Sequence, residues 1–419
     1  MRLRSILSIT LVLALALVMV SGCAVAQTAA PVDVVIWHTF TNAQDATLNA
    51  IADEFNASQT AAKIVVQSQP YQDFRPNVLS AVSNGVGPNI IFDYASTAAD
   101  YVEEGLVADI GQYIDDPQIG IPDFKATLPA ALIEEAYGFV DDKMHAWPLV
   151  TTGPIFFYNK TLYDELGLKA PETWAELASN SQAIFDAKGI PGFAADSITD
   201  IGQMLILQNG SGYIDTESKT ILWNSPEAIE RLNWFVELLK SGVFALNPTG
   251  DYFSNDFNTG TLASYAGSCA GVPYITPDGF EYAVAPLPQD GSQKWYPAWN
   301  RGFIIFSADE AVEKASYEFA KFYASAENNA KWVEAMIALS PYSYTAETEA
   351  YKTFLAANPA LAAVQANLQY AGFLPSVTGS ATVRTELDKA VKLAVGGQST
   401  IQEAVAEAEK ASNDALQGK

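Results

Sequence analysis

The sequence predicts an α/β protein of two doubly wound lobes. Short β-branched runs alternate with longer amphipathic segments, a pattern typical of strands and helices packed in layers. The chain has 419 residues, 49% of them hydrophobic and 11% aromatic, which is enough apolar material for two domains with separate cores. We expect residues 33–145 and 280–328 to form the first lobe, and residues 146–279 and 329–419 to form the second lobe with its C-terminal helices.

The first third of the chain has the strand and helix order of one such lobe. Strands are expected at residues 32–36, 63–67 and 89–92, and helices at residues 44–56, 74–84 and 98–104. In a doubly wound sheet, ligands bind beyond the carboxyl ends of the strands. Residues that directly follow these strands are therefore candidates for a binding site.

The second lobe is expected to begin where the character of the chain changes. We place the crossing at residues 143–150, ahead of a strand at residues 155–158. Pro171, followed by Glu172 and Thr173, gives the usual start of a helix. Further helices are expected at residues 201–209, 225–241 and 383–417, the last broken by Gly396 and Gly397, and strands at residues 280–286 and 302–307 are expected to return to the first lobe.

The N-terminus has the order of a bacterial lipoprotein signal. Two arginines precede an uncharged apolar stretch at residues 6–20, and small residues then lead directly to Cys23. We expect residues 1–22 to be a signal peptide, Cys23 to carry lipid and residues 23–32 to be a tether. The protein would then be extracytoplasmic and anchored to the bacterial cell membrane. An uncleaved membrane helix is the alternative, although the apolar run is short for a span of about 20 residues.

Charge and cysteine content exclude several classes of function. The formal net charge of -25 argues against binding to nucleic acid or to an anionic lipid surface. Cys269 is the one cysteine besides Cys23, so no internal disulfide is expected unless Cys23 remains unlipidated. Two separated histidines do not form a metal site, and the sequence has no Gly-rich phosphate loop. We expect neither a metal nor a cofactor.

Several short segments share their order and spacing with a known family. They are VVIWHTF at residues 34–40, FNAS at 55–58, NIIFDY at 89–94, IFFYNK at 155–160, PETW at 171–174, and residues 257–260 ahead of Ser268. Together they resemble the ABC-transporter extracellular solute-binding proteins of the maltose-binding and glycerol-3-phosphate-binding type. The resemblance implies two lobes joined by hinge segments, the type II periplasmic binding protein fold. It also implies a small ligand between the lobes, an ABC permease as partner, a monomer and no catalysis.

The resemblance leaves two ligand classes open. By comparison with the glycerol-3-phosphate-binding branch it implies ligand contacts at Tyr71, Thr151, Thr152, Ser268, Gly302 and Arg384. Ala95 stands where that branch has a glutamate, and Leu339 stands near its second tyrosine. We therefore expect a sugar, oligosaccharide or polyol, with glycerol 3-phosphate or a glycerophosphodiester as the alternative.

The chemistry of a sugar site selects further candidates, because a sugar presents hydroxyls around an apolar ring face. The aromatic candidates are Trp37, Tyr71, Tyr94, Trp299 and Phe373, and the polar ones are His38, Thr39, Asp93, Thr152, Ser268, Asn300, Arg301 and Arg384. Trp299 is expected in a loop ahead of a strand. Each aromatic ring could instead belong to a core, His38 could merely cap its loop, and Arg384 could pair with an acidic neighbour on its own helix.

Two other classes of function are carried as alternatives. An exported glycoside hydrolase would need two carboxylates about 5 to 10 Å apart, and acidic residues are plentiful. An iron-binding protein would use paired tyrosines, and Tyr342 and Tyr344 would lie on one side of a strand.

Overall fold

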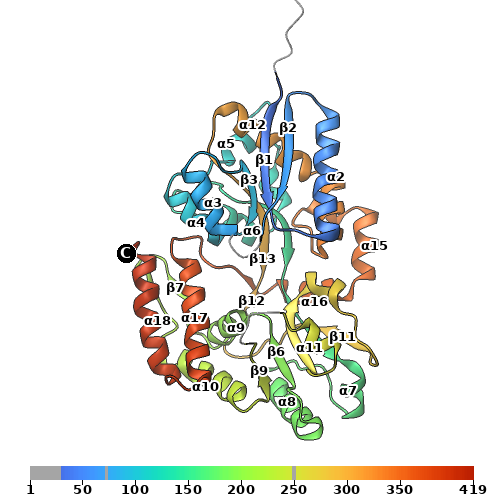
Figure 1. Cartoon of the computed structure of the whole chain (residues 1–419), viewed down its shortest axis with the longest axis vertical. Coiled ribbons are helices and arrows are strands. Elements are labelled where there is room, and N and C mark those ends of the chain that lie inside the picture. The colour runs from blue at the N-terminus through green and yellow to red at the C-terminus, as the bar shows by residue number, and fades with distance from the viewer. Residues whose placement is uncertain (1–29, 71–73, 248–251) are drawn as a thin grey trace, which may run out of the picture.

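The computed structural model describes residues 30–70, 74–247 and 252–419. Two mixed sheets lie one above the other in it, each flanked by helices (Figure 1). We call the upper unit lobe I and the lower unit lobe II. The predicted α/β fold class is confirmed.

Lobe I is built on a sheet with the strand order β2-β1-β3-β13-β4. Its strands are β1 (Val32–His38), β2 (Ala62–Ser68), β3 (Ile90–Asp93), β4 (Trp147–Thr152) and β13 (Trp299–Ile305). β1 runs parallel to β2 and β3, whereas β13 runs antiparallel to β3 and β4. The carboxyl ends of β1 and β3 therefore meet at the edge of the sheet that faces lobe II (Figure 1).

Lobe II is built on a sheet with the strand order β11-β5-β10-β6-β9. Its strands are β5 (Pro154–Asn159), β6 (Phe193–Ala195), β9 (Phe244–Ala245), β10 (Ser264–Ser268) and β11 (Tyr282–Ala285). Two small pairs complete the strands, β7 (Ile214–Asp215) with β8 (Thr220–Ile221), and β12 (Tyr296–Pro297) with β14 (Ala371–Gly372). β6 and β10 run parallel, so their carboxyl ends also meet at one edge.

Helices cover both faces of each sheet. Those that pack on lobe I are α2 (Asn42–Ser58), α3 (Phe74–Ser83), α4 (Ala95–Glu103), α5 (Gly111–Ile114), η1 (Phe124–Thr127), α6 (Ala130–Tyr137), α12 (Glu310–Tyr323), α13 (Ala326–Met336), α14 (Ser343–Ala346) and α15 (Glu349–Ala357). Those of lobe II are α7 (Lys160–Glu165), α8 (Trp174–Lys188), α9 (Ile198–Gln208), α10 (Pro226–Lys240), α11 (Ser254–Asn258), η2 (Cys269–Tyr274), α16 (Pro359–Leu368), α17 (Ser380–Val395) and α18 (Ile401–Leu416).

The start of α8 follows from local sequence chemistry. The Thr173 side chain accepts a hydrogen bond from the Glu176 backbone, and the Glu176 side chain accepts one from the Thr173 backbone. This capping box pairs backbone N–H groups that the first helical turn leaves without partners. The predicted helix start at this point is confirmed.

The chain passes between the lobes at positions that differ in part from those expected. β4 pairs with β13 in lobe I, so the first crossing comes after Thr152, at Gly153, and not at residue 146. β11 pairs with β5 in lobe II, so the expected return of residues 280–286 to lobe I is wrong. β13, in contrast, returns as expected.

The helix that follows α12 also departs from the expected boundary. Trp332 and Val333 of α13 are buried in the core of lobe I, although residues 329–419 were expected in lobe II. α16, α17 and α18 pack on the core of lobe II as expected.

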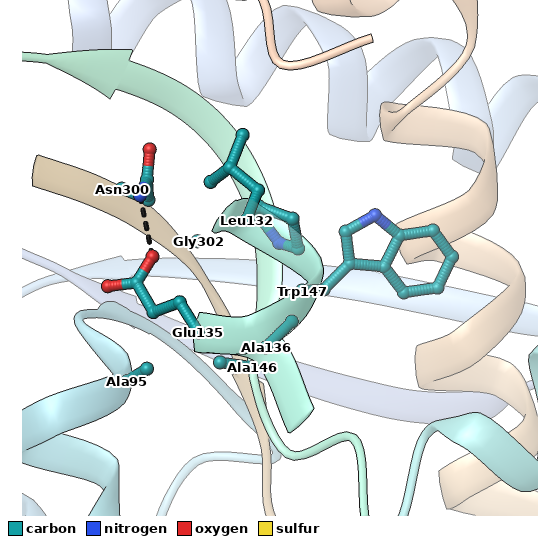
Figure 2. A pocket seen from close by; sticks show the side chains of 9 residues that line it. Ala95, Leu132, Glu135, Ala136, Ala146, Trp147, Asn300 and Gly302 are labelled. Atoms are coloured by element: carbon teal, nitrogen blue, oxygen red, sulfur yellow. Dashed lines mark hydrogen bonds between the residues drawn. The ribbon is translucent and has the colours of Figure 1, made fainter. Parts of the chain in front are cut away.

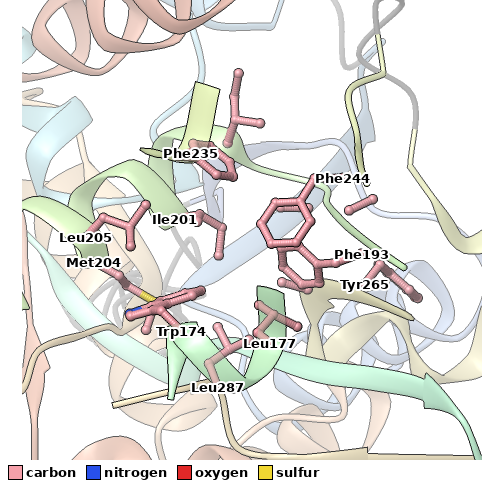
Figure 3. Packing of buried hydrophobic residues seen from close by; sticks show 14 of the residues in the cluster. Trp174, Leu177, Phe193, Ile201, Met204, Leu205, Phe235, Phe244, Tyr265 and Leu287 are labelled. Atoms are coloured by element: carbon pink, nitrogen blue, oxygen red, sulfur yellow. The ribbon is translucent and has the colours of Figure 1, made fainter. Parts of the chain in front are cut away.

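Lobe II has the larger continuous core. Figure 3 shows part of it, where Trp174 from α8 lies beside Met204 from α9, and Phe193 from β6 lies beside Phe244 from β9. The indole N–H of Trp174 donates to Gln208 at 2.7 Å, so the buried polar atom of this large side chain has a partner. These packed cores fix the strand ends that carry the candidate site.

Four predictions lie wholly or largely outside the described residues: the signal peptide, lipid attachment at Cys23, the tether at residues 23–32, and ligand contact by Tyr71. Across residues 30–70, 74–247 and 252–419, no helix has the length and apolar character needed to span a bilayer.

Candidate functional site

The candidate residues gather where the two lobes face each other. We define this interlobe face by residues 37–39, 93–95, 151–153, 196–203, 267–268, 299–302 and 384. They come from the carboxyl ends of β1, β3, β6 and β10, from the hinge strands β4 and β13, and from α9 and α17. The expectation that ligand-facing residues follow strand ends therefore agrees with their placement.

Trp37 and His38 at the end of β1 differ in how far they are buried. The indole of Trp37 is partly buried and donates to Gln67 at 2.8 Å. His38 is only 1% exposed, and its Nδ1 accepts from the Phe40 backbone at 3.1 Å. Burial lowers the pKa of His38, so the ring is neutral at pH 7 and holds the loop. The structure therefore places His38 in the loop core, while Trp37 keeps an exposed part.

Asp93 at the end of β3 is already paired within lobe I. Arg75 donates to its two carboxylate oxygens at 2.8 and 3.1 Å, and the Tyr94 backbone donates at 2.9 Å. Asp93 is 3% exposed, whereas Tyr94 is partly exposed. The geometry makes Tyr94 the more accessible of these two predicted residues.

The hinge strands bring Thr152 and Trp299 together across the β4 and β13 pair. The Thr152 hydroxyl donates to the Trp299 carbonyl at 3.4 Å. Trp299 is part of β13, so its expected position in a loop is wrong, and its side chain is partly exposed. Its strand places it at the hinge between the lobes.

A hydrogen-bonded chain beside these residues joins the hinge strands to α6 within lobe I. The Thr151 hydroxyl donates to Asn300 Oδ1 at 2.6 Å, and Asn300 Nδ2 donates to Glu135 of α6 at 2.6 Å (Figure 2). The Thr151 backbone also exchanges hydrogen bonds with Leu339 at 2.8 and 2.9 Å. Burial raises the pKa of Glu135 to about 8, against the lowering effect of the Asn300 hydrogen bond.

Gly302 lies where β13 and β4 approach each other most closely. The pairing of these strands shifts register between Arg301 and Gly302. A Cβ atom at Gly302 would overlap the carbonyl oxygen of Trp147. Only glycine fits this position without a shift of the backbone.

Arg301 points from β13 toward the end of β1. It donates to the Thr39 hydroxyl and to the Phe92 carbonyl, both at 3.3 Å, and its guanidinium lies 4.5 Å from the centre of the Phe40 ring. Within the described part of the chain, Arg301 has no carboxylate in an ion pair. The predicted residues Thr39 and Arg301 are thus in direct contact.

Arg384 on α17 is held by lobe II. It donates to Asp200 at 2.6 Å and to the Gln203 side-chain oxygen at 3.1 Å, both on α9. Asp200 is 2% exposed, whereas the Arg384 side chain is 32% exposed. Burial alone would lower the pKa of Arg384, but the Asp200 carboxylate outweighs it, so the pKa is raised. The alternative, pairing with an acidic neighbour on its own helix, does not occur, and the partner Asp200 lies 184 residues away in the sequence.

Asp196 and Ser268 complete the lobe II side. Asp196 follows β6 and accepts from the Phe253 backbone at 2.8 Å. Burial raises the pKa of Asp196 to about 6, and that hydrogen bond opposes the effect. Ser268 caps η2 by accepting from the Ala270 backbone at 3.2 Å. Both groups lie at adjacent strand ends, since the Asp196 backbone donates to Ala266 of β10.

Sequence reasoning missed Glu135, Asp196, Asp200 and Gln203. Asp196 carried one usable signal, because it directly follows a short apolar strand and precedes a helix start at Ser197. Glu135 carried none, because it is one of 48 acidic residues and its partner is 165 positions away.

The tyrosines of the iron hypothesis do not face this site. Tyr342 precedes α14 and Tyr344 lies within it, so the expected strand is absent here. The Tyr342 hydroxyl donates to the Pro148 carbonyl, and the Tyr344 hydroxyl donates to the Ala324 carbonyl at 2.7 Å. In the described residues, no group of three or more acidic, histidine or cysteine side chains could hold a metal ion.

The sequence matches a family model and curated relatives. The model, described as bacterial extracellular solute-binding protein, matches residues 50–386. The sn-glycerol-3-phosphate-binding periplasmic protein UgpB of Brucella melitensis is 25% identical over 338 residues, which cover 75% of this chain and 77% of the relative. UgpB of Rhizobium meliloti is 24% identical over 318 residues, covering 70% and 72%.

Solved structures share the fold. The cyclic alpha-maltosyl-1,6-maltose binding protein of Arthrobacter globiformis has a TM-score of 0.78 at 24% identity, covering 93% of this chain and 100% of its own. An ABC substrate-binding protein of Listeria monocytogenes, in complex with cycloalternan, has a TM-score of 0.80 at 20% identity, covering 92% and 99%. The expected periplasmic binding protein fold is confirmed.

Proposed function

Because this chain belongs to the bacterial extracellular solute-binding proteins, we propose that it is the substrate-binding component of an ABC importer. Its ligand is a neutral sugar, oligosaccharide or polyol that binds between the lobes. The protein delivers this ligand to an ABC permease and performs no chemistry on it. A monomer with two lobes that open and close around the ligand suits this role.

The ion pair of Arg384 and Asp200 is the main observation in favour of a neutral ligand. A phosphate group binds best to a guanidinium whose charge is free. Here Asp200 compensates the charge of Arg384 at 2.6 Å, and the two groups together present fixed donors and acceptors. Such a pair suits vicinal hydroxyls, which both donate and accept hydrogen bonds.

Partly exposed aromatic rings support the same ligand class. Trp37 and Tyr94 lie on the lobe I side of the interlobe face, and Trp299 lies at the hinge. The apolar face of a sugar ring packs on such rings, while its hydroxyls reach polar partners. Thr39, Thr152, Asn300 and Ser268 are the neutral candidates for those contacts.

Glycerol 3-phosphate, or a glycerophosphodiester, is the second candidate ligand. Arg301 favours it, because no carboxylate among the described residues pairs with this guanidinium. The curated relatives named as sn-glycerol-3-phosphate-binding proteins also favour it. Against it stands Arg384, whose charge is already compensated.

An exported glycoside hydrolase is the alternative of another class. Its support is limited to the presence of the carboxyl groups Glu135 and Asp196, whose pKa values are raised. The family and the named relatives are binding proteins, which favours capture without hydrolysis. Release of reducing sugar from a bound oligosaccharide would separate the two functions.

We place the protein outside the cytoplasm, held at the bacterial membrane by lipid on Cys23 after loss of residues 1–22. The support is the order of the N-terminal sequence and the extracellular family. Metabolic labelling with a fatty acid should tag the native chain, and Cys23→Ala should remove the label and release the protein from the membrane.

A thermal-shift screen tests the ligand class. A ligand that binds only the folded protein raises the melting temperature, by an amount that grows with the ratio of ligand concentration to Kd. The panel would contain neutral mono- and oligosaccharides, polyols, glycerol 3-phosphate and glycerophosphodiesters. A rise with neutral sugars alone supports the proposal. A rise with phosphate compounds alone would move the protein to the second candidate, and no rise at all would contradict both.

A further inference from the structure

Glu135 is a carboxyl group with one hydrogen-bond donor among the described residues. It is partly buried at the interlobe end of α6, and Asn300 donates to its Oε2 at 2.6 Å. Within the described residues no donor contacts its second oxygen, Oε1, and no cation pairs with it. A carboxyl group that is partly removed from water and has a single partner contributes less stability than one with all its hydrogen bonds made. A residue of this kind needs a reason other than packing.

A small cavity lies against this carboxyl group. Its volume is about 10 Å³, which is room for about one water molecule or one hydroxyl group. Ala95, Leu132, Ala136, Trp147, Pro148 and Gly302 line it together with Glu135 and Asn300. None of these lining residues except Glu135 carries a charge, and Glu135 and Asn300 are the polar groups in an otherwise apolar wall (Figure 2).

The position of Glu135 is fixed from the hinge. Thr151 donates to Asn300 Oδ1, so the amide must present Nδ2 to Glu135. Asn300 therefore orients the carboxyl group while Oε1 stays available. The cavity also touches Ala95 and Gly302 of the interlobe face, which joins it to the proposed ligand site.

We propose that Glu135 is a further ligand-contacting residue, whose free carboxyl oxygen hydrogen-bonds one hydroxyl group of the bound ligand, with Asn300 as its positioning residue. This assignment rests on the proposed function and adds a specificity determinant to it. The hydroxyl group occupies the cavity, which has room for one group of that size. A ligand without this hydroxyl leaves Glu135 without a second partner and binds more weakly.

Isothermal titration calorimetry with deoxy analogues tests the assignment. The ligand would be the best neutral sugar from the thermal-shift screen, compared with each of its monodeoxy forms. Wild-type protein should lose about tenfold or more in affinity for one analogue. Glu135→Ala should bind the parent sugar about tenfold more weakly and should no longer distinguish that analogue from the parent.

Two controls separate contact from structure. Glu134→Gln changes the exposed neighbour on the same helix and should bind like wild type. Glu135→Gln preserves shape and the acceptor for Asn300, so it should fold normally and recover part of the discrimination. If Glu135→Ala and Glu135→Gln both bind every analogue as wild type does, the assignment is overturned. If wild type binds no compound of the panel, the proposed function fails first and this assignment fails with it.

Discussion

Arg384 of α17 donates to Asp200 of α9 at 2.6 Å, and this ion pair lies at the interlobe face of lobe II. Asp200 is buried, whereas about a third of the Arg384 side chain is exposed, so the arginine is the partner that a ligand can reach. The pair therefore joins two properties of the site: it keeps a buried carboxylate satisfied, and it decides how much positive charge the ligand meets.

Substitution of either partner should weaken the binding of neutral sugars, but only the loss of Asp200 should strengthen the binding of a phosphate compound. Asp200→Asn removes the compensating charge, so affinity for glycerol 3-phosphate should rise about tenfold while affinity for neutral sugars falls. Arg384→Ala should lower the affinity for neutral sugars about tenfold. It also leaves Asp200 unpaired, so the free energy of unfolding should fall by about 1–3 kcal/mol. Calorimetry and urea unfolding measure both effects. Lys389→Ala, an exposed change on the same helix, is the control. Unchanged preference in Asp200→Asn would contradict the proposed role of the pair.

The second prediction concerns packing of a sugar ring on Trp299 at the hinge. Its ring is partly exposed at the start of β13, so truncation to alanine removes apolar surface that a sugar ring would cover. Trp299→Ala should weaken sugar binding by about tenfold, and Trp299→Phe by less. Trp234→Phe, on α10 and away from the interlobe face, is a matched aromatic control. Equal affinities of wild type and Trp299→Ala would exclude stacking by this residue.

Because β13 and β4 lie close together at Gly302, one added methyl group there should lower the stability of the fold markedly. Gly302→Ala places a Cβ atom against the Trp147 carbonyl, so the hinge strands must separate. The free energy of unfolding should fall by about 1–3 kcal/mol. Gly271→Ala adds the same methyl group where no atom lies within 4 Å and should change stability by less than about 0.5 kcal/mol. Urea unfolding of both variants measures the difference, and similar stabilities would show that the backbone adapts.

Most elements were predictable from the sequence because their signals are local. Short runs rich in β-branched residues predict β1, β2 and β3, and Pro171 followed by Glu172 and Thr173 predicts the start of α8. The sheet that a strand joins is not a local property. β11 could pair with either sheet on its sequence alone, and packing against β5 decided it. Likewise, the apolar stripe of α13 with Trp332 fits either lobe until the fold is known.

In the candidate site, too, local sequence could be interpreted but long-range contacts could not. Trp299, Asn300, Arg301 and Gly302 were predicted from one short segment, and the structure places all of them at the hinge. Their partners were not predictable, because contacts such as that of Asn300 with Glu135 join residues 165 positions apart. Charge compensation at the site therefore requires the structure, and ligand contact by these four residues stays a prediction.

The pH dependence of stability should report on Glu135. Burial raises its pKa in the folded protein from 4.5 to about 8, so between these values the folded state binds more protons than the unfolded state. The free energy of unfolding therefore falls as pH rises through this window, by at most about 1.4 kcal/mol per pH unit. Urea unfolding from pH 5 to pH 9 should show a steeper fall for wild type than for Glu135→Gln. Asp196 contributes a fall of the same sign in both proteins, so only the difference between the two curves is diagnostic. Parallel curves would mean that Glu135 is ionised throughout.

A contact between the lobes predicts how closure is stabilised. The Gly379 backbone at the start of α17 donates to Asp100 of α4 at 3.4 Å, and the Thr378 hydroxyl donates to Glu103 of the same helix. These bonds join lobe II to lobe I away from the hinge strands, so they hold the lobes together only while the lobes are near each other. Removing them in Asp100→Ala with Thr378→Val should favour the open form.

The measurements are small-angle scattering of the free protein and calorimetry with its ligand. The double variant should have a larger radius of gyration when ligand-free, and its affinity should fall about three- to tenfold, because hydrogen bonds of this kind contribute about 0.5–1.5 kcal/mol each. Thr385→Val changes an exposed threonine further along α17 and should alter neither quantity. An unchanged radius together with unchanged affinity would show that the contact does not bias the equilibrium between open and closed forms. A larger radius with unchanged affinity would mean that ligand binding alone supplies the energy of closure.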